Sequence, residues 1–214
     1  MKQNVSRKRE RRQQIRVNLG TMDETVEKVC NDAQQGRGFS LFTLNLDHLV
    51  KLRLIPAFRA AYLRARYVTA DGWPVVWLGR RKGADVQRTA GADLIEPLCA
   101  EAAKRGLPVY LFGSSAVALR DAAEHLTGRF PALKIVGTES PDYDFRPDSP
   151  AADQAIERMA RSKAALCFVA LGAPKQELFA DRAATRCPDM GFLCIGAALD
   201  FLGGHQQRAP HWMQ

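Results

Sequence analysis

The run AALCFVALGAPKQELF, residues 164–179, decides the fold. Its first part is continuously apolar and ends at Gly172, as a strand does when both of its faces are buried. Its second part carries Gln176 and Glu177 and resumes as an apolar helical pattern. A buried strand that turns directly into a helix is typical of parallel α/β sheets, which bind anionic ligands at such corners.

Strand-like and helix-like segments alternate along the rest of the chain. The sequence predicts strands over residues 16–19, 39–45, 66–72, 108–113, 133–138, 164–172 and 192–195. It predicts helices over residues 21–38, 47–53, 56–64, 90–106, 114–130, 151–162 and 173–186. This alternation favours a Rossmann-like, doubly wound and mostly parallel sheet with helices on both faces. We expect a basic, disordered arm over residues 1–15 and a single α/β domain over residues 16–214.

Positive charge is concentrated at the N-terminus. Residues 1–16 hold seven Lys or Arg residues and one Glu, a net charge of +6 out of +8 for all 214 residues. The remaining body is nearly balanced and lacks the basic face of a nucleic-acid binder. No apolar run reaches the roughly 18 residues that span a bilayer, and the arm lacks the apolar segment of a signal peptide. We therefore expect a cytoplasmic protein whose arm is either solvated or attracted to an anionic membrane surface.

The motifs argue against a metal or a cofactor. Five scattered cysteines include no C-x-x-C pair, and the four histidines show no ligand spacing. Asp142 and Asp144 have the D-x-D spacing by which many nucleotide-sugar transferases hold a divalent metal, but the flanking prolines indicate a surface loop. Neither G-x-G-x-x-G nor G-x-x-x-x-G-K-[ST] occurs, which disfavours a nicotinamide-dependent oxidoreductase.

Glycines and polar residues gather where the predicted strands end. They are Thr43, Asn45, Asp71, Gly72, Gly113, Ser114, Gly172, Gln176, Glu177 and Asp200. The carboxyl ends of parallel strands meet at one edge of a sheet, so these residues form a candidate site. The Gly113–Ser115 turn suits a phosphate at the next helix N-terminus, although a serine there can simply cap the helix. Asp71 suits a general base or a plain Asp-Gly turn, and with Asp200 it would also admit glycoside hydrolysis.

Six segments occur in an order and spacing that resemble the WecG/TagA/CpsF glycosyltransferases (glycosyltransferase family 26). They are TLNLDHL (43–49), ADGWPVV (70–76), TAGADL (89–94), LFGSS (111–115), ALGAPKQE (170–177) and GAALDFLGGHQQRAPHWM (196–213). The resemblance extends from about residue 15 to the end of the chain.

The resemblance implies an inverting, metal-independent enzyme of bacterial surface or exopolysaccharide assembly. Such an enzyme transfers a hexose from a UDP-sugar to a polyprenyl-diphosphate-linked saccharide at the cytoplasmic leaflet. The family's catalytic base falls on Asp71, and its substrate-pocket motif on Thr43 and Asn45. Its nucleotide-sugar and pocket positions fall on Gln176, Glu177 and Asp200, and Arg208 lies in the segment that leads toward the acceptor. Glucose, N-acetylmannosamine and its uronic acid all suit the family.

The chain departs from the family pattern in two places. Residues 141–144 stand where relatives commonly carry a Gly-Tyr pair, and the sequence stops at Gln214, where relatives continue into a basic C-terminal appendage. We therefore expect a domain that lacks this appendage. A non-catalytic nucleotide-sugar binding module of the same fold is the alternative hypothesis, because a fold alone does not fix an activity. The sequence is also compatible with a homo-oligomer.

Overall fold

The computed structural model describes residues 14–207, so most of the predicted basic arm and the residue Arg208 lie outside it. The strands are β1 (Phe39–Leu44), β2 (Tyr67–Ala70), β3 (Val109–Gly113), β4 (Ile135–Glu139), β5 (Leu166–Ala170) and β6 (Gly191–Cys194). The helices are α1 (Met22–Gln34), α2 (Leu46–Leu54), α3 (Pro56–Arg64), α4 (Trp73–Arg81), α5 (Gly91–Arg105), α6 (Ala116–Arg129), α7 (Pro150–Ser162), α8 (Lys175–Arg186) and α9 (Ala198–Leu202).

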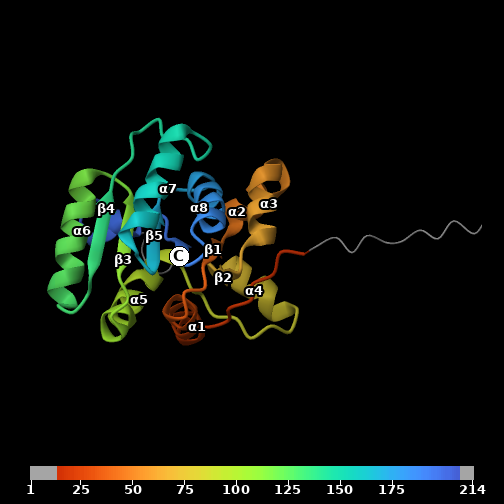
Figure 1. The fold of residues 1–214 in the computed structure, drawn as a ribbon. Helices are drawn as coiled ribbons and strands as arrows, with labels where there is room; N and C mark the ends of the chain where they lie inside the picture. The colour runs from red at the N-terminus through yellow and green to blue at the C-terminus, as the bar shows by residue number, and fades with distance from the viewer. Residues whose placement is uncertain (1–13, 208–214) are drawn as a thin grey trace, which may run out of the picture.

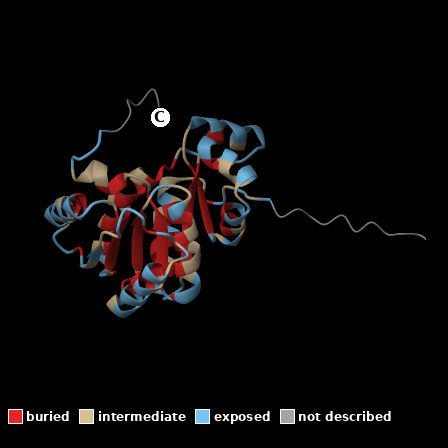
Figure 2. Cartoon of the chain, turned by 90° about the horizontal axis from the view of Figure 1, so that it is seen from above, coloured by how far each residue is buried: buried red, intermediate tan, exposed pale blue. Residues whose placement is uncertain are grey.

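The six strands form one parallel sheet in the order β2-β1-β6-β5-β3-β4. One face packs against α2, α3, α4, α7 and α8, and the other against α1, α5, α6 and α9. Figure 1 shows the strands between α7 and α8 on one side and α1 and α5 on the other. Every residue of β1, β3, β5 and β6 is buried, and Figure 2 shows these strands at the centre of the molecule. The predicted doubly wound fold is confirmed, with a sheet that is parallel throughout.

Local signals explain where the first helix begins. Thr21 Oγ1 accepts a hydrogen bond from the Glu24 N–H over 3.2 Å, as an N-cap residue does. The Glu24 carboxylate in turn accepts from the Gly20 N–H over 2.8 Å. The side chains at positions 21 and 24 thus satisfy backbone donors at the start of α1 in the manner of a capping box.

The predicted strand over residues 16–19 is wrong. The N–H groups of Asn18 and Leu19 both donate to the Val68 carbonyl, and no regular ladder forms. The Asn18 side chain takes the place of a ladder, because its amide accepts from the Val68 N–H and donates to the Arg66 carbonyl, each over 2.8 Å. This segment therefore lies along β2 without joining the sheet.

The order of the strands places a site at their carboxyl ends. From the middle of the sheet, the β1 to β2 connection runs toward one edge and the β3 to β4 connection toward the other. Parallel sheets bind ligands where the direction of winding reverses in this way. Within residues 14–207, no helix combines the length and the apolar character that crossing a membrane requires.

Candidate functional site

Two adjoining cavities open at the carboxyl edge of the sheet, and Gly196 and Ala197 line both of them. The first has a volume of about 440 Å³ and the second about 630 Å³. Of the predicted residues, the first cavity holds Thr43, Asn45, Asp71 and Gln176, and the second holds Ser114, Gly172 and Asp200. The structure thus brings together residues from five different strand ends.

Three other predicted residues line neither cavity. Gly72 and Gly113 have backbone φ angles of 99° and 109°, a region that favours glycine. A Cβ atom at Gly113 would lie 2.2 Å from the Ala170 carbonyl oxygen, so only glycine lets the end of β3 lie this close to β5. Glu177 is fully buried behind the first cavity. These residues shape the site from outside the space that a ligand would fill.

Asp71 follows β2 and faces the first cavity. Its Oδ2 atom accepts a hydrogen bond from Thr43 Oγ1 over 3.5 Å. Burial raises the pKa of the Asp71 carboxyl, while the nearby Arg88 charge and hydrogen bonds from Thr43 and Asn45 offset part of this rise. A carboxylate whose pKa is raised takes up a proton more readily than an exposed one. A carboxyl in this environment would suit general-base catalysis.

Asn45 connects the start of α2 to this carboxyl. Its Oδ1 atom accepts from the His48 N–H over 2.9 Å and so caps the helix. Because the amide oxygen is used in this way, the amide N–H group is the donor that Asn45 offers to Asp71. Capping thus fixes the orientation of a side chain that lines the cavity.

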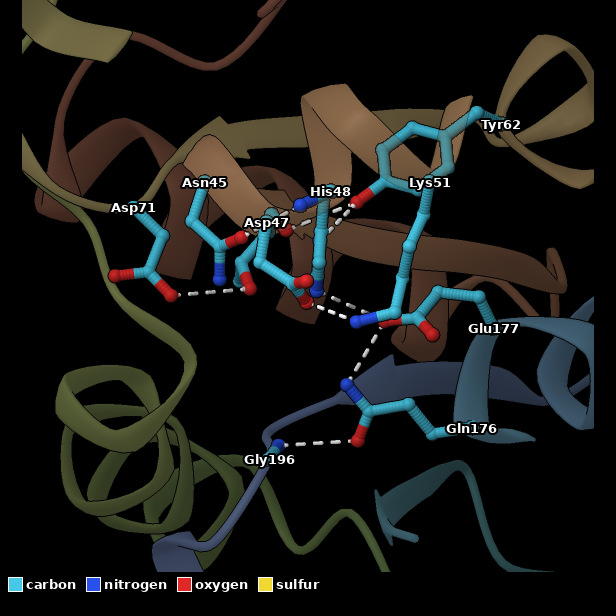
Figure 3. A network of polar contacts seen from close by, with 10 residues as sticks. Asn45, Asp47, His48, Lys51, Tyr62, Asp71, Gln176, Glu177 and Gly196 are labelled. Carbon is cyan, nitrogen blue, oxygen red and sulfur yellow. Dashed lines mark hydrogen bonds and ion pairs between the residues drawn. The ribbon is translucent and has the colours of Figure 1, made fainter. Parts of the chain in front are cut away.

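A buried chain of hydrogen bonds runs inward from the first cavity, whose lining includes Thr43 and His48 (Figure 3). The Tyr62 hydroxyl donates to the Thr43 carbonyl over 2.9 Å, and His48 Nδ1 lies 2.7 Å from the same hydroxyl. Since the single hydroxyl hydrogen of Tyr62 is already used, His48 Nδ1 must be the donor. Burial lowers the pKa of His48, which favours the neutral ring. Its other nitrogen, Nε2, lies 4.0 Å from Glu177 Oε1.

Both polar atoms of the Gln176 side-chain amide form hydrogen bonds. Its Nε2 atom donates to Glu177 Oε1 over 2.8 Å, and its Oε1 atom accepts from the Gly196 N–H over 3.1 Å. Burial raises the pKa of Glu177 to about 7. Among the described residues, Glu177 Oε2 has no hydrogen-bond partner. The result is a Gln176 side chain that joins the start of α8 to the end of β6 in a fixed orientation.

The second cavity lies over the ends of β3 and β5. Ser114 Oγ donates to Asp200 Oδ1 over 2.7 Å, and Ser115 is the residue that caps α6. The N-terminal residues of α6 and α8 line this cavity through Ser115 and Lys175. Two helix N-termini and the Lys175 ammonium group place positive charge at this cavity, as an anionic ligand requires, and the carboxyl groups of Asp142 and Asp200 also line it.

The contribution of the segment that leads into α5 and of the first residues of this helix was not predicted. Arg88, Ala90, Gly91 and Ala92 all line the first cavity. A Cβ atom at Gly91 would lie 2.8 Å from Ile195 Cα, so glycine lets α5 begin directly against the end of β6. TAGADL, residues 89–94, is one of the six segments that resemble the family, so the sequence did carry a signal here.

The D-x-D segment, residues 142–144, lies at the second cavity. Asp142 and Tyr143 line it, and Tyr143 is fully exposed. Within residues 14–207, no group of three or more His, Cys, Asp or Glu side chains converges as metal ligands would.

A comparison with protein families finds a match over nearly the whole chain. The sequence model of the glycosyl transferase WecG/TagA/CpsF family matches residues 12–214. The matched region includes both cavities and every element of the sheet.

Proposed function

The chain belongs to the WecG/TagA/CpsF glycosyltransferases, and we propose that it transfers a hexose from a UDP-sugar to a polyprenyl-diphosphate-linked saccharide. The observation that carries this proposal is Asp71, a partly buried carboxyl of raised pKa that faces a cavity. The same cavity also holds the amide side chains of Asn45 and Gln176, which suit the hydroxyl groups of a sugar.

In the proposed reaction, Asp71 takes the proton from the acceptor hydroxyl as its oxygen attacks the anomeric carbon. The bond between that carbon and the UDP oxygen breaks on the opposite face, and UDP leaves with the electron pair. A single displacement of this kind inverts the anomeric configuration. Thr43 and Asn45 stabilise the ionised form of Asp71 in the free enzyme, so the base is ready when the acceptor arrives.

The second cavity is the proposed site of the UDP diphosphate. The N-termini of α6 and α8 and the Lys175 ammonium group would stabilise the charge that develops on the leaving group. These groups are the basis on which we propose that the reaction needs no metal. Gln176 would orient the sugar, because its amide is fixed by Glu177 and Gly196 and faces the first cavity.

We further propose that the enzyme acts at the cytoplasmic leaflet as a peripheral protein, where a lipid-linked acceptor is available. Calorimetric titration with UDP, first in EDTA and then with Mn²⁺, tests the donor site, with NAD as the control ligand. Binding of UDP that is unaffected by EDTA supports the metal-independent transferase. Binding that requires Mn²⁺ would overturn metal independence, and an absence of UDP binding in both conditions would overturn the proposed donor.

A further inference from the structure

Large apolar side chains are exposed on two helices beside the first cavity. They are Leu46, Val50 and Leu54 on α2 and Trp73, Trp77 and Leu78 on α4, each between 40% and 73% exposed. We call these six residues the α2–α4 patch. They make up six of the nine large exposed apolar residues within 14–207, so apolar exposure is concentrated here. The α2 residues recur every four positions and therefore share one face of the helix.

The two helices border a common groove, and Leu78 belongs both to the patch and to the lining of this groove. This groove has a volume of about 490 Å³ and is lined by Leu49 of α2 and by Val75 and Leu78 of α4. Ile15 and Val17 line it as well. An exposed apolar area that continues into an apolar groove is typical of an interaction surface.

Basic residues flank the α2–α4 patch. Arg80, Arg81 and Lys82 end α4 or follow it directly, and the Arg81 guanidinium lies 5.2 Å from the centre of the Trp77 ring. Gln14, the first residue described, lines the groove together with Arg16. Tryptophan beside clustered basic residues fits the headgroup region of an anionic bilayer.

The patch begins at the rim of the first cavity. Leu46 directly follows Asn45, and Trp73 is two residues from Asp71. We infer that the α2–α4 patch docks the protein on an anionic lipid bilayer, with Trp73 and Trp77 at the level of the headgroups. This inference rests on the proposed function, since docking would bring the mouth of the first cavity to the depth at which a lipid-linked saccharide lies.

Tryptophan fluorescence tests this docking directly. The chain has three tryptophans, Trp73, Trp77 and Trp212, so the substitution Trp212→Phe leaves emission only from the patch. Vesicles of phosphatidylglycerol and phosphatidylcholine should shift this emission to shorter wavelength, and lipids brominated near the headgroup should quench it. Raising the salt concentration should weaken binding, because basic residues supply part of the attraction.

Substitutions distinguish membrane binding through the α2–α4 patch from binding through other parts of the surface. In vesicle sedimentation, Trp73→Ser combined with Trp77→Ser should lower the partition coefficient at least about tenfold, since both indoles are then lost to the interface. Val117→Ser on α6 removes an apolar side chain of similar exposure (48%) and should leave partitioning unchanged.

Three results would overturn the inference. One is an absence of binding to anionic vesicles, and another is binding that leaves the emission unchanged, which would assign the contact to another part of the chain. The third is emission that shifts with protein concentration before vesicles are added, which would assign the patch to a second copy. The vesicle experiments use neither UDP-sugar nor acceptor, so the UDP titration still tests the proposed function independently of their result.

Discussion

Thr43 Oγ1 donates a hydrogen bond to Asp71 Oδ2 over 3.5 Å and so joins the ends of two neighbouring parallel strands. The Asp71 N–H also donates to the Leu44 carbonyl over 2.8 Å, which continues the pairing of β1 with β2 by one more bond. The backbone of the sheet therefore sets the position of the carboxyl. A group held on a rigid strand end is better placed for catalysis than one on a mobile loop.

Replacing Thr43 by valine should move the pH dependence of transfer. The Thr43 hydrogen bond lowers the pKa of Asp71, so its loss should raise that pKa further. The ionised carboxylate is the active form, and kcat/KM should therefore rise with pH through a midpoint that lies higher in Thr43→Val than in the wild type. Thr127→Val on the exposed side of α6 is the control. An unmoved acid limb would contradict the role given to this bond.

Glu177 should make the fold less stable as pH rises. Its pKa is about 7 in the folded protein against an ordinary value of 4.5, so the folded state binds a proton that the unfolded state has released between these values. The stabilising contribution is therefore complete below about pH 4.5 and lost as pH rises through 7. Its size is on the order of 3 kcal/mol.

Urea unfolding of the wild type and Glu177→Gln at several pH values measures this contribution. The difference between the two free energies of unfolding isolates Glu177, because the other titrating groups are common to both proteins. The wild type should lose stability relative to Glu177→Gln between about pH 4.5 and 8. Two parallel curves would show that Glu177 ionises in the folded protein much as it does in the unfolded chain.

Gly113→Ala should destabilise the protein by at least about 2 kcal/mol, because it adds a Cβ atom at a positive φ. This atom would lie 2.2 Å from the Ala170 carbonyl oxygen, and the backbone of β3 or β5 would have to move. Gly128→Ala in α6 is the matched control, since its Cβ atom would meet nothing within 4 Å. It should raise stability by about 0.5–1 kcal/mol. Chemical denaturation of both variants checks the contrast, and equal effects would refute it.

The sheet was predictable because its strands are buried on both faces. Continuous apolar runs such as residues 166–170 leave few alternatives to a parallel strand. The shared edge of the site followed from this, since the carboxyl ends of parallel strands lie together. Thr43, Asn45 and Asp71 accordingly line one cavity although they come from two strand ends.

Other features depend on contacts that no local pattern reveals. Helix α4 was not predicted. It buries Val75 and Val76 but exposes Trp73 and Trp77, so apolar residues occur on both its inner and its outer face and give no clear helical pattern. Helix α9 is only five residues long and lies in a segment where the sequence predicts no helix. The burial of Glu177 depends on neighbours from other elements, with the His48 ring 4.0 Å away.

The role of Asp71 as the base is tested most directly by Asp71→Asn, which keeps the shape of the side chain and removes its basicity. UDP release from a panel of UDP-sugars, with a prenyl-diphosphate-linked saccharide as acceptor, gives the turnover, and calorimetry gives the affinity for UDP. The exposed Asp189→Asn is the control. Turnover by Asp71→Asn should fall about 10²- to 10⁴-fold while UDP affinity stays within about threefold. Turnover close to that of the wild type would contradict the proposed mechanism.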